Sequence, residues 1–250
     1  MNFKKHALPL AAVSAAVILM VAIIAQATTP SVPDFSQYPE GTERKMAFFD
    51  YFQPLIEDHN RSIRELRSRL LNWYRHRENL GWSARLQVER IASEYGLGTF
   101  KVNSESHWQT LLRRVDIIPT SLVLAQAAME SAWGTSRFAR EVNNYFGQWC
   151  FKKGCGVVPG NRKEGARHEV ADFDSPRESL ASYFRNLNSY YAYKPFRELR
   201  ARLRAKNKPI TGIALADGLT FYSERRANYI EELRAFMRQN NLVRIDNQDI

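Results

Sequence analysis

Residues 119–147 read PTSLVLAQAAMESAWGTSRFAREVNNYFG. A proline followed by threonine and serine is typical of a helix start, and Gly134 is a typical helix stop, so the pattern predicts a helix over residues 120–133. Almost every side chain in this range is apolar, and such a helix must be buried nearly all round. The stretch therefore predicts a domain that is built around this one helix.

Glu130 is the acidic exception in this apolar helix. Helical spacing puts it on one face with Val123 and Ala127, so we expect its carboxylate in a place that is poor in water. An ionised carboxylate is costly there, and a raised pKa keeps the proton on near neutral pH. A protonated carboxyl group is suited to act as a general acid. The alternative is a helix-terminal glutamate that pairs with Arg137 or Arg140.

A second short helix is expected after Gly134, with Thr135 or Ser136 as its cap, and it ends at the sequence NNYFG of residues 143–147. Two asparagines before an aromatic residue and a glycine predict a turn. We expect the amides of Asn143 and Asn144 to face outward, where they would suit a polar ligand such as a sugar.

These sequences carry a family resemblance. AQAAMESAWG at residues 125–134 and NNYFG at residues 143–147 resemble the signature of glycoside hydrolase family 73, the bacterial glucosaminidase domains. DIIP at residues 116–119 and GQWCFKKGCG at residues 147–156 resemble the Bax-type branch of proteobacterial proteins. The resemblance covers about residues 48–242. It implies a lysozyme-like α+β fold, mostly α, with a small β-hairpin lobe, and an enzyme that cuts peptidoglycan, generally between N-acetylglucosamine and N-acetylmuramic acid.

The resemblance also implies roles for individual residues. Glu130 would be the acid, with a tyrosine beside it, for which Tyr222 is the candidate while Tyr229 is expected to pack. The remaining candidates, all for substrate binding, are Trp133, Asn143, Asn144, Phe146 and Gln148.

A second catalytic carboxylate is harder to place. The family position for it falls on GVVP at residues 156–159, which has no carboxylate. Glu169 is the candidate, because alternating strand geometry can aim it toward the site. The alternatives are that Glu169 pairs with an arginine or lysine, or that the acetamide group of the sugar replaces the carboxylate.

The only cysteines are Cys150 and Cys155. In an exported protein a pair this close predicts a disulfide loop. Two cysteines without a histidine pair do not make a zinc site, so no metal is expected. We find no phosphate-binding glycine loop and no Ser-His-Asp pattern, and we expect no cofactor.

The start of the chain has the layout of an export segment. Lys4 and Lys5 precede an apolar run over residues 10–25, and Ala25-Gln26-Ala27 is a candidate cleavage site. Residues 1–27 are therefore predicted to be a signal peptide or a membrane anchor, the latter through residues 7–27. Either reading places the protein in the periplasm, free or anchored to the inner membrane.

The rest of the chain divides by its patterns into four parts. Residues 28–41, with three prolines, read as a linker with little structure, and residues 42–99 as a helical extension that Pro54 interrupts. Residues 100–242 form the glucosaminidase domain, and residues 243–250 a tail. The extension is expected to dock on the domain, with a short coiled-coil dimer as the alternative.

Within the domain, the patterns predict a small hairpin from residues 157–158 and 168–173. A capping box at residues 175–178 opens a helix, and further helices are expected over residues 199–205 and 230–240.

The formal charge is +10, and it falls to +8 if Lys4 and Lys5 are removed. A basic surface fits either nucleic acid or the polyanionic cell wall, and an exported protein meets the wall. The expected partner is peptidoglycan, with no nucleic acid. Together with this charge, the family resemblance implies an endo-β-N-acetylglucosaminidase of the wall. The alternatives are a muramidase or lytic transglycosylase, and a non-catalytic scaffold that binds the wall.

Overall fold

The computed structural model describes residues 31–160, 162, 165–223 and 225–248. The chain divides into Met1–Pro33 and Asp34–Ile250, and the account below concerns the second unit. The predicted signal peptide or anchor, residues 1–27, lies outside the described residues. Within the described part of the chain, no helix has the length and apolar character needed to cross a bilayer.

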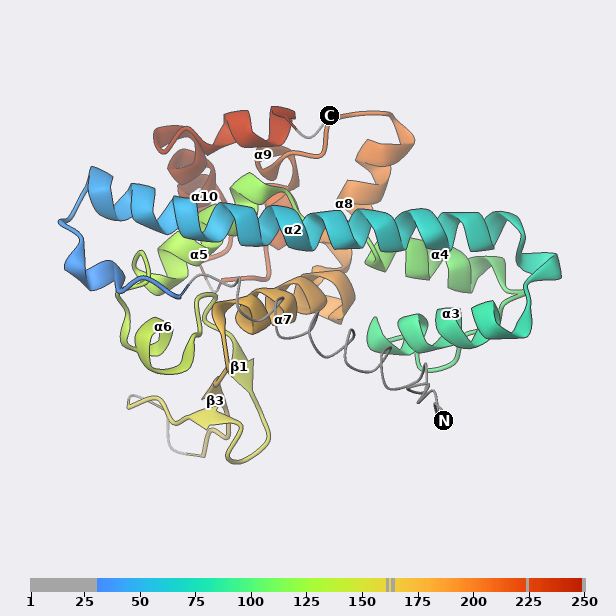
Figure 1. Ribbon diagram of the computed structural model, residues 1–250, viewed down its shortest axis with the longest axis horizontal. Helices are drawn as coiled ribbons and strands as arrows, with labels where there is room; N and C mark the ends of the chain where they lie inside the picture. Colours follow the sequence, from blue (N-terminus) through green and yellow to red (C-terminus); the bar gives the residue numbers. More distant parts are fainter. Residues whose placement is uncertain (1–30, 161, 163–164, 224, 249–250) are drawn as a thin grey trace, which may run out of the picture. The chain divides into compact units, whose positions relative to one another are not determined.

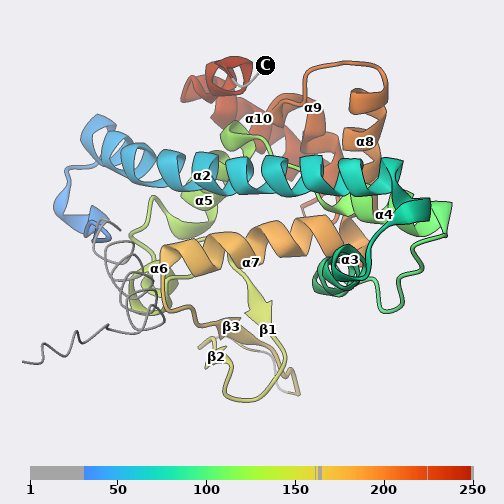
Figure 2. The same ribbon diagram turned by 45° about the vertical axis from the view of Figure 1, so that its right-hand side comes forward.

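The fold is mostly helical with one small sheet, which confirms the α+β class (Figures 1 and 2). The helices are α2 (Thr42–Arg75), α3 (Trp82–Glu94), α4 (Glu105–Arg114), α5 (Thr120–Ser131), α6 (Arg137–Val142), α7 (Pro176–Ser189), α8 (Lys194–Ala205), α9 (Gly212–Leu215) and α10 (Ala227–Gln239). The strands are β1 (Trp149–Cys150), β2 (Gly156–Val157) and β3 (Glu169–Ala171), and the 3-10 turns are η1 (Phe35–Gln37), η2 (Arg77–Asn79), η3 (Tyr191–Tyr193), η4 (Ala216–Leu219) and η5 (Leu242–Gln248).

Helix α5 lies at the centre of the unit. Its residues 120–128 are all buried, and α2, α9, α10 and η5 pack against it. The helix ends earlier than its apolar pattern predicts, because Ala132 and Trp133 both take left-handed backbone conformations, with φ angles of 50° and 58°. Gly134 follows in the same region of φ and packs directly under Phe35, where a β-carbon would lie 2.2 Å from a ring atom.

The predicted helical extension is part of the same core. Helix α2 runs across α5, α4 and α7 (Figure 1) and continues through Pro54 without a break. Phe48 and Phe52 are fully buried on it, and burial of side chains of this size is worth roughly 1.5–3 kcal/mol each. This packing is the docked arrangement that we expected in preference to a coiled-coil dimer.

Both ends of the unit are more ordered than the sequence suggests. Phe35–Gln37, in the predicted linker, form η1, and Phe35 is buried against Phe48 and Phe52. The predicted tail forms η5, and the carboxylate of Asp246 accepts hydrogen bonds from the Ser121 amide at 3.1 Å and the Gly212 amide at 2.8 Å. Pro119 provides no side-chain cap for α5, so Asp246 caps this helix from a distant part of the chain.

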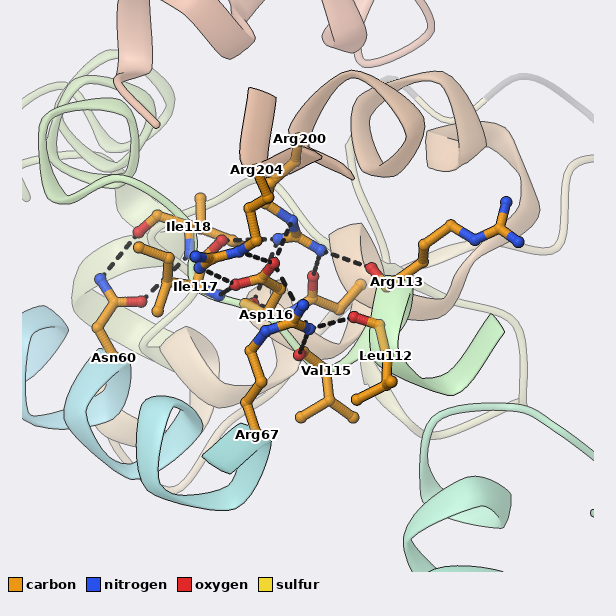
Figure 3. A network of polar contacts seen from close by, with 11 residues as sticks. Asn60, Arg67, Leu112, Arg113, Val115, Asp116, Ile117, Ile118, Arg200 and Arg204 are labelled. Carbon is orange, nitrogen blue, oxygen red and sulfur yellow. Dashed lines mark hydrogen bonds and ion pairs between the residues drawn. The ribbon is translucent and has the colours of Figure 1, made fainter. Parts of the chain in front are cut away.

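A buried polar network holds the segment that leads into α5 (Figure 3). Asp116 accepts two hydrogen bonds from Arg204 of α8, at 2.6 and 2.5 Å, and Arg67 of α2 and Arg200 of α8 approach the same carboxylate at 3.6 and 3.7 Å. Arg200 also donates to the backbone oxygens of Arg113, Asp116 and Ile117. The network joins α2, α8 and the end of α4 to the start of the central helix.

The small sheet has the strand order β1-β3-β2, with both pairs antiparallel. The predicted hairpin is the β2–β3 pair, and β1 adds a third strand that we did not predict. Cys150 pairs with Glu169 and Trp149 with Val170 in the β1–β3 register. The predicted disulfide between Cys150 and Cys155 is present and closes the loop between β1 and β2.

Candidate active site

Glu130 occupies the last turn of α5, one residue before the helix ends. The residue as a whole reaches the solvent, while its carboxylate is largely desolvated, as we expected. The left-handed backbone at Ala132 and Trp133 ends the helix directly after this turn, in which Ala128 and Ser131 stay buried and Glu130 reaches the surface. An acid that must reach a substrate has to lie at such a surface.

The Glu130 carboxylate contacts two residues from later parts of the chain, Tyr229 and Gly147. Its Oε1 accepts a hydrogen bond from the Tyr229 hydroxyl at 3.3 Å, and its Oε2 lies 3.4 Å from the place where a β-carbon on Gly147 would be. Gly147 has a φ of 63°, and this conformation favours glycine. Within the described residues Glu130 forms no ion pair with Arg137 or Arg140, which the alternative interpretation required; Arg137 instead approaches Glu141 at 3.8 Å.

The pKa of Glu130 is raised above its ordinary value. Loss of solvent around the carboxylate is the largest cause, while the hydrogen bond from Tyr229 and the positive charge of Arg225 act in the opposite direction. A raised pKa increases the fraction of molecules that carry the proton near neutral pH. The carboxyl group of Glu130 therefore has the access that a general acid needs, and its pKa is shifted in the direction that favours this role.

The tyrosine that bonds Glu130 is Tyr229, which corrects the expectation that Tyr222 would take this place and Tyr229 would only pack. The Tyr222 hydroxyl donates to the backbone oxygen of Phe146 at 3.0 Å. The two tyrosine rings stack with their centroids 5.6 Å apart. Tyr229 lies on α10 and Tyr222 in the preceding loop, and the sequence did not fix the helix register that decides between them.

Gln126 of α5 donates a hydrogen bond to Tyr229, and we did not predict this role for Gln126 from the sequence. Its Nε2 donates to the Tyr229 hydroxyl at 2.9 Å, and its Oε1 accepts from the Tyr183 hydroxyl of α7. A usable signal was present, because Gln126 stands four residues before Glu130 and so shares its helix face. Burial raises the pKa of Tyr183 and of Tyr229, so both hydroxyls keep their protons and act as donors.

The turn after α6 is built differently from our expectation of outward-facing amides. Asn143 donates to the Phe173 oxygen at 2.8 Å, and Asn144, which is buried, donates to the oxygens of Gln148 and Ala171 at 2.8 and 2.9 Å. These amides fix the turn to the sheet, because buried backbone oxygens need donors.

Two further candidates for substrate binding are also engaged inside the protein. The Gln148 side chain donates to the backbone oxygen of Ser179 at 2.9 Å. The ring of Phe146 is 2% exposed and stacks on Tyr183 at 4.2 Å. Their visible role is to position Gly147 between them, against Glu130.

Trp133 packs among aromatic residues. Its ring lies 5.3 Å from Phe49 and 5.2 Å from Phe236, with the ammonium group of Lys45 5.2 Å above it. It also borders a hollow of about 320 Å³ with Lys45 and Thr135. These contacts explain Trp133 as a packing residue at the end of α5.

Glu169 is held by backbone groups rather than by arginine or lysine. Its two oxygens accept from the Gly154 amide at 3.1 Å and the Gly156 amide at 3.0 Å. These backbone bonds, the one from Gly154 first, hold its pKa below the ordinary range, and the residue is 6% exposed. Both carboxylate oxygens thus accept backbone hydrogen bonds at the end of the disulfide loop and the start of β2, so the geometry does not support Glu169 as a free second catalytic group.

Glu169 and the two cysteines form the one cluster of residues within the described ranges that could hold a metal ion. Cys150, Cys155 and Glu169 lie with their ligand atoms within 4.8 Å of one another. Both sulfur atoms belong to the disulfide and cannot act as thiolate ligands. The cluster is therefore structural.

Comparison with known proteins adds two findings. The glucosaminidase family model, described as mannosyl-glycoprotein endo-β-N-acetylglucosaminidase, matches residues 105–242. The Escherichia coli (strain K12) protein Bax is 39% identical over 217 residues, which cover 86% of this chain and 76% of that protein. No solved structure matches the chain.

Proposed function

The chain belongs to the glucosaminidase family, and from this premise we propose that it is a peptidoglycan hydrolase, an endo-β-N-acetylglucosaminidase in which Glu130 is the general acid. Family membership supports a glycoside hydrolase that acts on peptidoglycan. The observation that carries the proposal is the carboxyl group of Glu130, with its raised pKa, at the end of the central helix.

In the first step the proton of Glu130 passes to the oxygen of the glycosidic bond, which then leaves as a neutral hydroxyl group. The Tyr229 hydroxyl stays bonded to Oε1 at 3.3 Å and stabilises the carboxylate that forms. Gly147, beside Oε2, leaves room for the sugar to approach the acid.

The second group in this proposal is the acetamide of the sugar. The hydrogen bonds that both Glu169 oxygens accept from the Gly154 and Gly156 amides favour the acetamide over a protein carboxylate. The acetamide oxygen bonds to the anomeric carbon as the leaving group departs, which closes a five-membered ring on the sugar. A water molecule then attacks the anomeric carbon and opens this new ring, while Glu130 takes a proton from the water. This route returns Glu130 to its protonated form.

The test is digestion of purified peptidoglycan by the full-length chain, with products identified by mass. Wild type is expected to release fragments with reducing N-acetylglucosamine ends, and Glu130→Gln to release none above background. Glu141→Gln, which changes an exposed glutamate on the next helix, is the matched control and should behave as wild type.

Other products would point to the alternatives. Reducing muramic ends would indicate a muramidase, and anhydro-muramic ends a lytic transglycosylase, each with Glu130 still as the acid. Binding to the wall without release by wild type would indicate a scaffold and would refute the enzyme proposal.

We also propose that the protein acts in the periplasm, free or anchored to the inner membrane. Support comes from the export pattern of residues 1–27 and from the net positive charge, which favours attraction to an anionic wall. Cell fractionation, with the size of the mature chain measured by mass, would distinguish a cleaved from an anchored form and would reject export if the protein stays in the cytosol.

A further inference from the structure

The small sheet exposes a large aromatic side chain that the mechanism above does not use. Trp149 of β1 is 58% exposed. Its ring stacks on His168 with centroids 4.2 Å apart and an angle of 17° between the planes. Since His168 covers one face of the indole, the exposed area belongs to the opposite face and the edges.

The sheet keeps this indole in a fixed orientation. Trp149 pairs with Val170 and Cys150 with Glu169, so Trp149 lies on one face of the sheet and the disulfide on the other. On the disulfide face, Glu169 accepts hydrogen bonds from the Gly154 amide of the Cys150–Cys155 loop and from the Gly156 amide at the start of β2. A rigid support of this kind lowers the entropy that is lost when a ligand binds.

Trp149 is also close to the acid along the chain. Gly147 adjoins the Oε2 atom of Glu130, at 3.4 Å from the position of a β-carbon. Two residues of extended chain span at most about 7 Å, so the backbone of Trp149 lies within that distance of Gly147. The backbone that carries the exposed indole thus lies close to the site of bond cleavage.

The chemistry of the surface indicates its ligand. An indole offers a broad flat apolar face, and exposed aromatic surface beside a polar site is typical of a binding surface. Pyranose rings present flat faces of C–H groups that match it. We infer that Trp149, oriented by His168, is a platform on which a sugar ring of the glycan strand stacks, next to the ring that Glu130 protonates. This inference rests on the proposed function, because it takes the glycan strand as the occupant.

The first experiment measures cleavage of peptidoglycan by the full-length chain. Trp149→Ala is expected to raise KM about tenfold and to change kcat less, because a stacked aromatic contact is lost without a change at the acid. Trp149→Phe should retain most of the binding. The matched control is Trp82→Ala, which removes a tryptophan that is 77% exposed on α3 and should leave KM unchanged.

The second experiment measures binding without turnover. In the Glu130→Gln background, a chito-oligosaccharide of N-acetylglucosamine is expected to change the tryptophan fluorescence. The change should disappear in Glu130→Gln/Trp149→Phe and persist in Glu130→Gln/Trp82→Phe. His168→Ala should weaken binding of the oligosaccharide, whereas His168→Phe should keep it near the level with His168, since a phenyl ring can stack on the indole as the imidazole does.

The outcomes separate this inference from the proposed function. If wild type cleaves peptidoglycan and Trp149→Ala has an unchanged KM, the platform is refuted and the enzyme stands. If wild type neither cleaves nor binds glycan, the function fails and the platform fails with it. If Trp149→Ala cleaves normally but loses binding to another protein, the surface is a protein interface and the inference is overturned.

Discussion

Glu130 accepts the last bond of a directed chain of hydrogen bonds. Tyr183 donates to Gln126, and Gln126 donates to Tyr229. Tyr229 then donates to Glu130. Each donor in such a chain polarises the next, so a buried tyrosine on α7 affects a carboxylate at the end of α5.

Replacing Tyr229 by phenylalanine should raise the pKa of Glu130 further. The Tyr229 hydroxyl stabilises the ionised carboxylate, so its removal favours the protonated form. A general acid works while it is protonated, and the alkaline limb of the kcat/KM profile should therefore move to higher pH. A pH–rate series on both proteins measures this.

The control for this change is Tyr222→Phe. That variant loses a bond to the Phe146 oxygen and leaves the one to Glu130 in place. Its alkaline limb should stay near that of wild type. A limb that moves with Tyr222→Phe and stays still with Tyr229→Phe would contradict the assignment of Tyr229.

At the level of single residues, the sequence identified Glu130 as the exceptional acid because an acidic residue in an apolar helix has few explanations. It failed for Asn143, Asn144 and Gln148, whose amides look suited to a ligand. Their partners are backbone oxygens of Phe173, Ala171 and Ser179, which lie about 30 residues further along the chain. No local pattern shows which distant oxygens a turn will need to satisfy.

The network around Asp116 brings arginines of α2 and α8 to one buried carboxylate. Burial opposes the ionisation of Asp116, but Arg200, Arg204 and Arg67 outweigh it and hold the pKa of the carboxyl group below its ordinary value of 3.8. Burial and the neighbouring arginines lower the pKa of Arg200 to about 10, with Asp116 acting in the opposite direction. One carboxylate thus compensates a cluster of guanidinium groups.

Asp116→Asn should destabilise the protein by about 3–5 kcal/mol at neutral pH, because it leaves buried arginine charge without a partner. Since the folded pKa is depressed, the stabilisation by Asp116 is present above about pH 4 and is lost as the pH falls through the folded pKa. The difference between wild type and variant should therefore shrink in acid. Urea unfolding at several pH values measures it.

Asp58→Asn is the matched control for this network. Asp58 lies on the surface of α2 and pairs with Arg177 at 2.8 Å. An exposed pair of this kind contributes at most about 1 kcal/mol. Equal losses for the two variants would contradict the role assigned to the Asp116 network.

Glu169 and the disulfide act together on the loop between β1 and β2. A disulfide that closes a loop this short stabilises the folded protein by about 2 kcal/mol in the loop-entropy model.

Glu169→Gln should keep cleavage within about tenfold of wild type, since loss of an acid–base group costs about 10²–10⁴-fold. The measurement is kcat/KM on peptidoglycan beside Glu130→Gln. A thousandfold loss in a folded Glu169→Gln protein would show that Glu169 takes part in catalysis.

The helices were more predictable than the strands. Apolar spacing and the Ser175 capping box located α7, whose first turn has the expected bond from the Glu178 amide to Ser175 at 3.2 Å. Strand β1 has two residues, which is too short for any alternation to be visible. The early end of α5 depends on left-handed backbone at Ala132 and Trp133, residue types that give no sign of it.

The whole unit closes on α5 from both directions along the chain. Near its C-terminal end, Phe35 from the N-terminal part packs on Gly134. At its N-terminal end, Asp246 accepts bonds from Ser121 and Gly212. The sequence predicted neither contact, because a short polar segment with prolines and a short terminal segment both read as unstructured.

Asp246→Ala should lower the free energy of unfolding by about 2–3 kcal/mol, through the loss of a helix cap and of charged hydrogen bonds in a buried place. Thermal and urea unfolding measure the loss. Asp34→Ala, which removes the cap of the exposed turn η1, is the control and should cost less. A smaller loss for Asp246→Ala than for Asp34→Ala would contradict the capping role.

The cap from Asp246 has a consequence for the timing of synthesis. Asp246 is 125 residues after Ser121, so the ribosome makes α5 long before its cap. At about 5–20 residues per second this interval is about 6–25 s. During that time α5, whose residues 120–128 are all buried in the finished fold, lacks both its cap and its partners α9 and α10, and the nascent protein must be shielded from other chains until the last segment is made.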